Sequence, residues 1–274
     1  MLLHEIIKAV VLGIIQGITE WLPISSTGHM ILADEFIRLN MGESFKELFL
    51  VVVQLGSIMA VVILYWRRLL PVSFGKKVVL KYETVSLWLK ILVACLPAAV
   101  IGLKYNDQID AIFFNYQTVI CTLIFYGILF IVIENKNKNK QPRIKKLSQL
   151  TYTTALLIGI FQVLALIPGT SRSGATIIGA ILLGTSRTIA AEFTFFLAIP
   201  VMFGASFLKI LKFGISMSGG ELAVLLTGML VAFVVSILAI RFLLGYIKKH
   251  NFKIFGWYRI LVGIILAVYF GFIA

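Results

Sequence analysis

The chain has 274 residues, of which 60% are hydrophobic and only 14% are charged. Soluble domains carry about 25% charged residues, so this chain has too few polar side chains to cover a surface that faces water. The composition excludes a cytosolic enzyme, a disordered protein and a secreted disulfide scaffold, and it indicates an all-α polytopic membrane protein. The net charge of +13 then indicates basic loops beside anionic lipid headgroups, with no nucleic acid partner.

Two apolar stretches of the chain are interrupted by polar residues. In the first stretch, residues 5–37, Leu-Pro-Ile-Ser-Ser-Thr-Gly-His interrupts at 22–29. In the second, residues 151–185, the interruption is Pro-Gly-Thr-Ser-Arg-Ser-Gly at 168–174. A short apolar helix, a polar break and a second short helix are typical of a re-entrant hairpin. Irregular backbone is tolerated at membrane depth only inside protein or beside a wet cavity.

Each interrupted stretch is followed by three runs long enough to span a hydrocarbon core of about 30 Å. These predicted spans lie near residues 47–66, 86–104, 115–133, 188–208, 221–240 and 254–272. Ser44 followed by Glu47 predicts a capping box at the start of the first span. Glu47 and Glu192 fall at nearly equivalent places in the two halves, and capping or packing is the interpretation for both. We therefore expect six spans and two re-entrant hairpins.

The distribution of basic residues predicts the orientation of the chain. Loops at 67–85, 134–150 and 241–253 lie on one side of the membrane and carry 15 of the 25 Lys and Arg residues. The positive-inside rule places this side in the cytoplasm. Both termini and the first hairpin are then expected to face outside, and the second hairpin is expected to enter from the cytoplasm.

A shift of 146 positions aligns the two halves of the chain. It superimposes Gly13 on Gly159, Gln16 on Gln162, Ser25 on Ser171, Thr27 on Ser173 and Gly28 on Gly174. We expect a single integral membrane domain with repeat one at 1–134, a linker at 135–146 and repeat two at 147–274. Each repeat has three spans, an odd number, so the repeats have opposite orientations. Inverted repeats of this kind place a polar site near the bilayer midplane.

Gln16 and Glu20 are four residues apart and share one face of the first short helix. A carboxylate inside an apolar segment costs roughly 2.5–3.5 kcal/mol unless it has a partner. Glu20 is therefore a candidate metal ligand or general acid or base. The alternative is a residue at the membrane interface.

The first break brings together three hydroxyls and an imidazole, from Ser25, Ser26, Thr27 and His29. The N–H groups at the start of the following helix favour a bound anion. Ser and Thr are also ordinary N-caps, so capping is the alternative for the hydroxyls. Capping does not explain His29, which is a candidate acid or base.

The second break contains Arg172 between the hydroxyls of Ser171 and Ser173. A guanidinium offers a rigid fork of donors that matches phosphate oxygens, so these residues are typical of a phosphate site. The alternative for Arg172 is an interfacial charge on the cytoplasmic side. Outside the breaks, Arg187 is interpreted as a loop charge, and Arg259 receives no assignment.

These motifs resemble a known family. Residues 16–29, Gln-Gly-Ile-Thr-Glu-Trp-Leu-Pro-Ile-Ser-Ser-Thr-Gly-His, resemble the first signature of the undecaprenyl-diphosphate phosphatase family of the bacitracin-resistance type. Residues 168–176, Pro-Gly-Thr-Ser-Arg-Ser-Gly-Ala-Thr, look like its second signature. The resemblance runs essentially from end to end. It implies a phosphatase of the bacterial plasma membrane that converts undecaprenyl diphosphate to undecaprenyl phosphate, recycles the carrier for cell-wall synthesis and confers bacitracin resistance.

The resemblance also implies site residues and partners. The family motif of Glu or Gln followed four residues later by Glu falls on Gln16 and Glu20, and it implies a divalent cation, Mg or Ca. Glu20 is then the only charged ligand that the motif supplies in this chain. The family's essential Ser, His and Arg fall on Ser26, His29 and Arg172. The resemblance further implies interlocked inverted repeats, a lipid diphosphate substrate, membrane lipids as neighbours and a homodimer.

Two mechanisms and a second function stay open. The expected ligands of the substrate phosphates are Arg172, Ser25, Thr27, Ser171 and Ser173. Either Ser26 attacks phosphorus and forms a phosphoserine, activated by His29 or Glu20, or one of these two groups activates water directly. The alternative function is a transporter or flippase of phosphate or lipid phosphate at the same site, alone or combined with hydrolysis.

Overall fold

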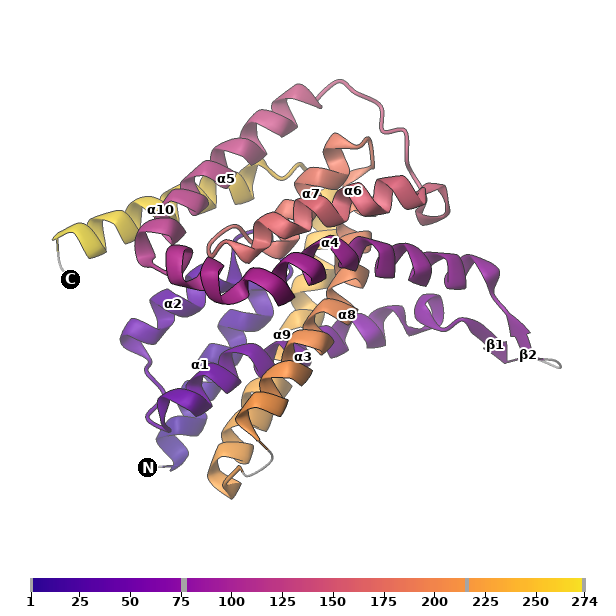
Figure 1. Cartoon of the computed structure of the whole chain (residues 1–274). Coiled ribbons are helices and arrows are strands. Elements are labelled where there is room, and N and C mark those ends of the chain that lie inside the picture. Colours follow the sequence, from indigo (N-terminus) through magenta and orange to yellow (C-terminus); the bar gives the residue numbers. More distant parts are fainter. Residues whose placement is uncertain (1, 75–77, 215–216, 273–274) are drawn as a thin grey trace.

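The computed structural model describes residues 2–74, 78–214 and 217–272. In these residues the chain forms ten α-helices, two short 3₁₀ helices and one small β-hairpin (Figure 1). The α-helices are α1 (Leu2–Thr19), α2 (Ser26–Phe36), α3 (Glu43–Leu69), α4 (Tyr82–Phe113), α5 (Tyr116–Lys136), α6 (Tyr152–Val163), α7 (Arg172–Leu182), α8 (Arg187–Phe213), α9 (Gly219–Ile247) and α10 (Lys253–Phe272). The 3₁₀ helices are η1 (Leu147–Gln149) and η2 (Leu164–Leu166).

The prediction of a polytopic helical membrane protein is confirmed. The six predicted spans correspond to α3, α4, α5, α8, α9 and α10, although Asn115 at the start of the third is the N-cap of α5. All six helices are long and apolar enough to cross a membrane. Helix α1 is a seventh candidate by length and composition. Its 18 residues rise about 27 Å. Helices α2 and α7 have 11 residues each and rise only about 16 Å, which is too short for a span.

The structure corrects two details of the sequence interpretation. The basic loop at 67–85 contains the antiparallel strands β1 (Val72–Phe74) and β2 (Val78–Leu80), so the fold is all-helical apart from this hairpin. The predicted capping box of Ser44 is wrong. Helix α3 begins at Glu43, and the N-cap position is occupied by Gly42, two residues before Ser44, without a side-chain cap.

The halves of the chain are interlocked, because helices of one half pack along helices of the other. Helix α1 lies along α9, α4 lies along α6, and α5 lies along α10 (Figure 1). Glycine permits two of these close approaches. A Cβ atom on Gly13 of α1 would lie 2.7 Å from the carbonyl oxygen of Gly228 in α9, and one on Gly159 of α6 would lie 2.2 Å from that of Ala94 in α4. The two glycines are the pair that the 146-residue shift aligned.

Helices α3 and α8 pack against each other and are joined by an ion pair near each end. Arg68 Nη1 lies 2.9 Å from Glu192 Oε1, and Lys209 Nζ lies 2.7 Å from Glu47 Oε2. Glu47 and Glu192 therefore have the same role in the two halves. Neither is a cap. Glu47 joins the start of α3 to the end of α8, and Glu192 joins the start of α8 to the end of α3.

Arg187 is not a simple loop charge. Its guanidinium binds both carboxylate oxygens of Glu134, with Nε at 2.9 Å from Oε1. The side chain of Glu134 is buried and also accepts the N–H of Phe252 at 3.1 Å. One carboxylate therefore ties the end of α5 to the start of α8 and to the connection between α9 and α10.

Helix α7 lies at the centre of this assembly. Nine of its 11 residues are buried, and its apolar side chains belong to the largest core cluster together with those of α8. A helix that is enclosed on nearly all sides is held rigidly by packing. The first turn of α7, which carries Arg172, is therefore fixed in place.

Candidate active site

The two polar breaks begin where α1 and α6 end. Helix α1 ends at Thr19 and α2 begins at Ser26, whereas α6 with η2 ends at Leu166 and α7 begins at Arg172. The breaks are thus shorter than predicted at their C-terminal ends. Ser26, Thr27 and His29 lie in the first turns of α2, and Arg172 and Ser173 lie in the first turn of α7.

Ser25 and Ser171 have a left-handed backbone, with φ of 75° and 72°. They are the two non-glycine residues with positive φ in the described part of the chain, and such values are strained for serine. Each hydroxyl oxygen accepts a helix N–H, from Gly28 at 3.2 Å and from Gly174 at 3.1 Å. The capping alternative is confirmed for Ser25 and not for Ser26 or Thr27, which lie within α2. Ser171 caps α7 in the same way, a cap that was not predicted from the sequence.

The carboxylate of Glu20 joins the two breaks. It is 4% exposed and is therefore enclosed by protein. Its Oε2 accepts from Gln16 Nε2 and from Ser26 Oγ, both at 3.0 Å. Its Oε1 accepts from Arg172 Nη2 at 3.1 Å. A hydroxyl of one break and a guanidinium of the other therefore share one buried carboxylate.

Arg172 is anchored on two sides. In addition to Glu20 it binds the carbonyl oxygen of Thr194 in α8, from Nη1 at 3.0 Å. Its side chain is 11% exposed, and its Nε is buried and has no hydrogen-bond partner among the described residues. A guanidinium has five N–H donors, so Arg172 retains three that can bind an anion.

Ser173 also connects the breaks. Its hydroxyl lies within hydrogen-bond distance of the carbonyl oxygens of Glu20, at 3.2 Å, and Leu22, at 3.4 Å, and of Ser171 Oγ at 3.1 Å. Ser173 as a whole is 2% exposed. Ser173 therefore holds the start of α7 against the backbone of the first break.

Arg259 was missed by the sequence interpretation. It is fully buried in α10, and its guanidinium donates to carbonyls of both breaks. Nη1 lies 3.3 Å from the oxygen of Pro23, and Nη2 lies 2.8 Å from that of Gly169. Two longer bonds, of 3.4 and 3.5 Å, reach the carbonyls of Thr122 and Leu123 in α5. The sequence does contain a signal for this role. A charged residue in the middle of an apolar span is energetically costly unless it has buried hydrogen-bond partners.

His29 and Thr27 are not brought to the Glu20 carboxylate. His29 Nδ1 lies 2.7 Å from the carbonyl oxygen of Ser25, and Nε2 lies 2.8 Å from Tyr258 Oη. A carbonyl only accepts, so Nδ1 carries the proton and a neutral His29 accepts from Tyr258 at Nε2. Thr27 is exposed, and within the described residues its hydroxyl has no hydrogen bond.

The residues at the breaks offer few ligands for a divalent cation. The described residues contain no group of three His, Cys, Asp or Glu side chains that lie together. The oxygen ligands at the breaks are the carboxylate of Glu20, the amide of Gln16 and hydroxyls. This set does not fit a closed protein cage. It fits a cation such as Mg that takes one carboxylate and receives its other ligands from phosphate and water.

The geometry favours an anion with several oxygens. Two helix N-termini, those of α2 and α7, meet where Arg172 retains free donors, and the first N–H groups of a helix have no acceptor within it. Ser26 donates to a carboxylate, which is the arrangement of a nucleophile beside a base. These features together are typical of a phosphoryl-transfer site.

Comparison with known proteins identifies the family. Residues 9–265 match the family described as "Bacitracin resistance protein BacA". The chain belongs to the BacA family. This confirms the resemblance seen in the two signatures, which supply Glu20, Ser26 and Arg172 to the site.

The chain is also similar, over nearly its whole length, to curated proteins. Undecaprenyl-diphosphatase of Desulfitobacterium hafniense is 65% identical over 271 residues, which are 98% of each chain. Undecaprenyl-diphosphatase 1 of Clostridium acetobutylicum is 62% identical over 267 residues, 97% of each chain. Undecaprenyl-diphosphatase of Enterococcus faecalis is 61% identical over 272 residues, 98% of this chain and 99% of the relative.

Proposed function

We propose that this chain is an undecaprenyl-diphosphatase of the bacterial plasma membrane. It hydrolyses undecaprenyl diphosphate to undecaprenyl phosphate and inorganic phosphate, which recycles the lipid carrier for cell-wall synthesis and confers resistance to bacitracin. Full-length relatives of that name and membership of the BacA family support the proposal. The observation that carries it is the Glu20 carboxylate, which links Ser26 of one break to Arg172 of the other.

The diphosphate binds between the first turns of α2 and α7. Arg172 donates its remaining N–H groups to the phosphate oxygens, together with the N–H groups at the two helix starts. Ser25, Ser171 and Ser173 support this cradle through the backbone that they hold in place. Thr27, exposed in the first turn of α2, offers its hydroxyl directly to the substrate.

Ser26 is the nucleophile and Glu20 is its base. Glu20 accepts the Ser26 proton as Oγ attacks the terminal phosphorus. Undecaprenyl phosphate leaves, and water then hydrolyses the phosphoserine to release phosphate. His29 becomes available to this water when Tyr258 releases its Nε2.

Glu20 and Gln16 are the residues that would hold a divalent cation, Mg or Ca. Such a cation supplies positive charge that stabilises the oxyanions of the transition state. Because Glu20 is both ligand and base, its replacement removes two contributions at once.

We further propose that the fold consists of two inverted repeats, each with a re-entrant hairpin and three spans. The equivalent roles of Ser25 and Ser171, and of the ion pairs that join α3 to α8, support this assignment. The basic loops then face the cytoplasm, and both termini and the site open to the outside. The homodimer stays a prediction.

The test is release of inorganic phosphate by detergent-purified protein from undecaprenyl diphosphate, with Mg, with Ca and with a chelator. Glu20→Gln and Arg172→Gln are each expected to lower kcat by at least about 100-fold, which is the usual loss on removing one transition-state contact. Lys209→Gln, in the exposed ion pair with Glu47, is the control and keeps wild-type activity.

Two results would count against the proposal. A well-folded wild-type protein that releases no phosphate in detergent, but moves lipid phosphate across sealed vesicles, is a transporter, because only transport needs a closed compartment. Ser26→Ala with most of its activity retained would refute the phosphoserine route and leave water as the nucleophile.

A further inference from the structure

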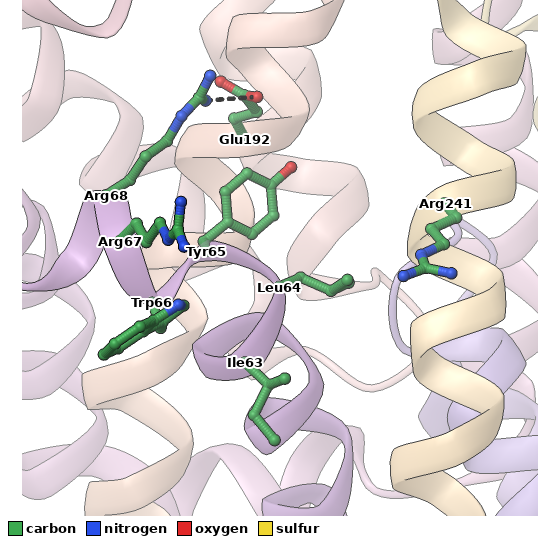
Figure 2. Close-up of a pocket in the computed structure, with 8 residues that line it drawn as sticks. All are labelled: Ile63, Leu64, Tyr65, Trp66, Arg67, Arg68, Glu192 and Arg241. Carbon is green, nitrogen blue, oxygen red and sulfur yellow. Dashed lines mark hydrogen bonds and ion pairs between the residues drawn. The ribbon is translucent and has the colours of Figure 1, made fainter.

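A cavity of about 590 Å³ lies between α3, α8 and α9, and none of its lining residues belongs to the candidate active site (Figure 2). It adjoins the last turns of α3, which lead into the basic loop with β1 and β2. Arg241 of α9 is six residues before the end of its helix, so the cavity extends about 9 Å inward from that end. It is therefore a pocket at the membrane boundary on the side of the basic loops.

The charge that lines the cavity is positive. Three arginines, Arg67, Arg68 and Arg241, face one carboxylate, Glu192. Arg68 is paired with Glu192 at 2.9 Å. Arg67 and Arg241 have no side-chain hydrogen bond or ion pair within the described residues, and Arg241 projects from α9 toward α3 (Figure 2). An anion that lies between two guanidinium groups of one cavity receives charge-assisted hydrogen bonds from both.

A buried hydroxyl in the same cavity lacks a partner. Tyr65 is 9% exposed, and its oxygen is buried without a hydrogen bond within the described residues. Its ring is held edge-on against Phe196 at 5.0 Å, and the guanidinium of Arg68 lies 5.8 Å from its centroid. A buried hydroxyl without a partner is unfavourable, so this donor is available to a ligand.

Apolar side chains beside the cavity indicate where the rest of the ligand lies. Trp66 is 54% exposed and Ile63 is 51% exposed, on the same end of α3. Exposed tryptophan is typical of the level of the lipid headgroups. A ligand with its anionic group between the arginines can therefore extend apolar chains along this surface into the bilayer.

We propose that this cavity binds the phosphate group of a membrane lipid. Arg67 and Arg241 bind the phosphate oxygens from two helices, and the Tyr65 hydroxyl donates to a third oxygen. Arg68 remains in its ion pair with Glu192 and lines the cavity without binding the phosphate. The site is separate from the hydrolytic one, and its occupation does not depend on hydrolysis.

The test is native mass spectrometry of the detergent-purified full chain with dioleoyl phosphatidic acid. Dioleoylglycerol has the same acyl chains without the phosphate and is the lipid control. Arg67→Gln and Arg241→Gln are each expected to weaken phosphatidic acid binding by about tenfold, and Tyr65→Phe by about threefold. Tyr65→Phe preserves the contact with Phe196, so it keeps the test valid if an arginine variant folds poorly.

Arg143→Gln is the matched control, because Arg143 is an exposed arginine on the same basic side that does not line the cavity. It is expected to bind phosphatidic acid like the wild type. All four variants retain phosphate release from the diphosphate substrate, so this test and the test of the phosphatase can fail separately.

Three outcomes would overturn the proposal. Dioleoylglycerol that binds as tightly as phosphatidic acid would show that the acyl chains alone are recognised. Equal losses in Arg143→Gln and Arg241→Gln would show a diffuse attraction to positive charge. Inorganic phosphate that binds alone and displaces the lipid at equal concentration would assign the cavity to free phosphate.

Discussion

Replacement of Arg259 by methionine tests whether one buried guanidinium holds the two breaks together. Methionine fills a similar volume in α10 but removes every donor. The carbonyls of Thr122 and Leu123 lie in α5, where the helix supplies its own donors. The carbonyls of Pro23 and Gly169 lie in the breaks, and within the described residues Arg259 is their only donor.

The expected loss of stability follows from these two carbonyls. A buried acceptor left unpaired costs about 1–3 kcal/mol, so both together cost about 2–6 kcal/mol. Arg259 pairs with no carboxylate in the described part of the chain, and removing its desolvation cost offsets part of this loss. A net loss of about 2–4 kcal/mol corresponds to a fall in Tm of about 4–8 °C at roughly 2 °C per kcal/mol.

The expected loss of activity is larger than the loss of stability suggests. If the breaks separate by about 1 Å, the bond from Arg172 to Glu20 lengthens with them, and a misplacement of that size costs about 100-fold in rate. The assay measures the Tm in detergent and kcat for phosphate release on the same preparations, below the Tm of every variant. Arg143→Met is the control, because this arginine is exposed.

Arg259→Lys tests whether the positive charge of Arg259 or the geometry of its guanidinium positions the two breaks. The contacts to Pro23 and Gly169 come from different nitrogens of the planar fork, whereas a lysine ammonium is a single point. We therefore expect the lysine variant to lose activity nearly as far as the methionine variant. Wild-type Tm and kcat in Arg259→Lys would refute the reasoning, because positive charge alone would then position the breaks.

The remaining predictions concern a cap, two ion pairs and the cation. Ser171→Gly is expected to be about 1 kcal/mol more stable than Ser171→Ala by thermal unfolding, because both lose the cap but glycine relieves the positive φ; equal Tm values would contradict this. Glu134→Ala is expected to lower the free energy of unfolding by about 2–4 kcal/mol, because Arg187 and the N–H of Phe252 lose a buried partner. Lys209→Ala, at an exposed ion pair, is expected to lower it by less than about 1 kcal/mol. Similar losses in the two variants would show that burial does not set the difference. A chelator is expected to abolish phosphate release with little change in Tm, and chelator-resistant release would remove the cation from the mechanism.

The sequence predicts the spans and the charged centre of the site for one physical reason. In an apolar chain, a charge or a polar break is conspicuous because it needs a partner at membrane depth. This reasoning found Glu20 and Arg172, which the structure joins at 3.1 Å. Arg259 gives the same signal, but no neighbouring motif says what it binds, since its partner Pro23 is 236 positions away.

Other parts of the site depend on geometry that a linear pattern does not contain. Which side of α2 faces Glu20 decides that Ser26 reaches the carboxylate while Thr27 is exposed. The partner of His29 is Tyr258 of α10, which no spacing rule places beside α2. Likewise, apolar periodicity identifies α1 and α9 as helices but does not say that they pack together.

The packing of α1 along α9 has a consequence for biosynthesis. About 200 residues separate the end of α1 from the start of α9. At about 5–20 residues per second, the ribosome needs roughly 10–40 s to make this segment. During that interval α1 lacks α9, the helix that packs against Gly13 in the finished protein. Glu20 likewise lacks its ion-pair partner Arg172, which lies 152 positions later in the chain. Until Arg172 has been synthesised, the Glu20 carboxylate needs another polar partner, from the insertion machinery or from a helix of the first half.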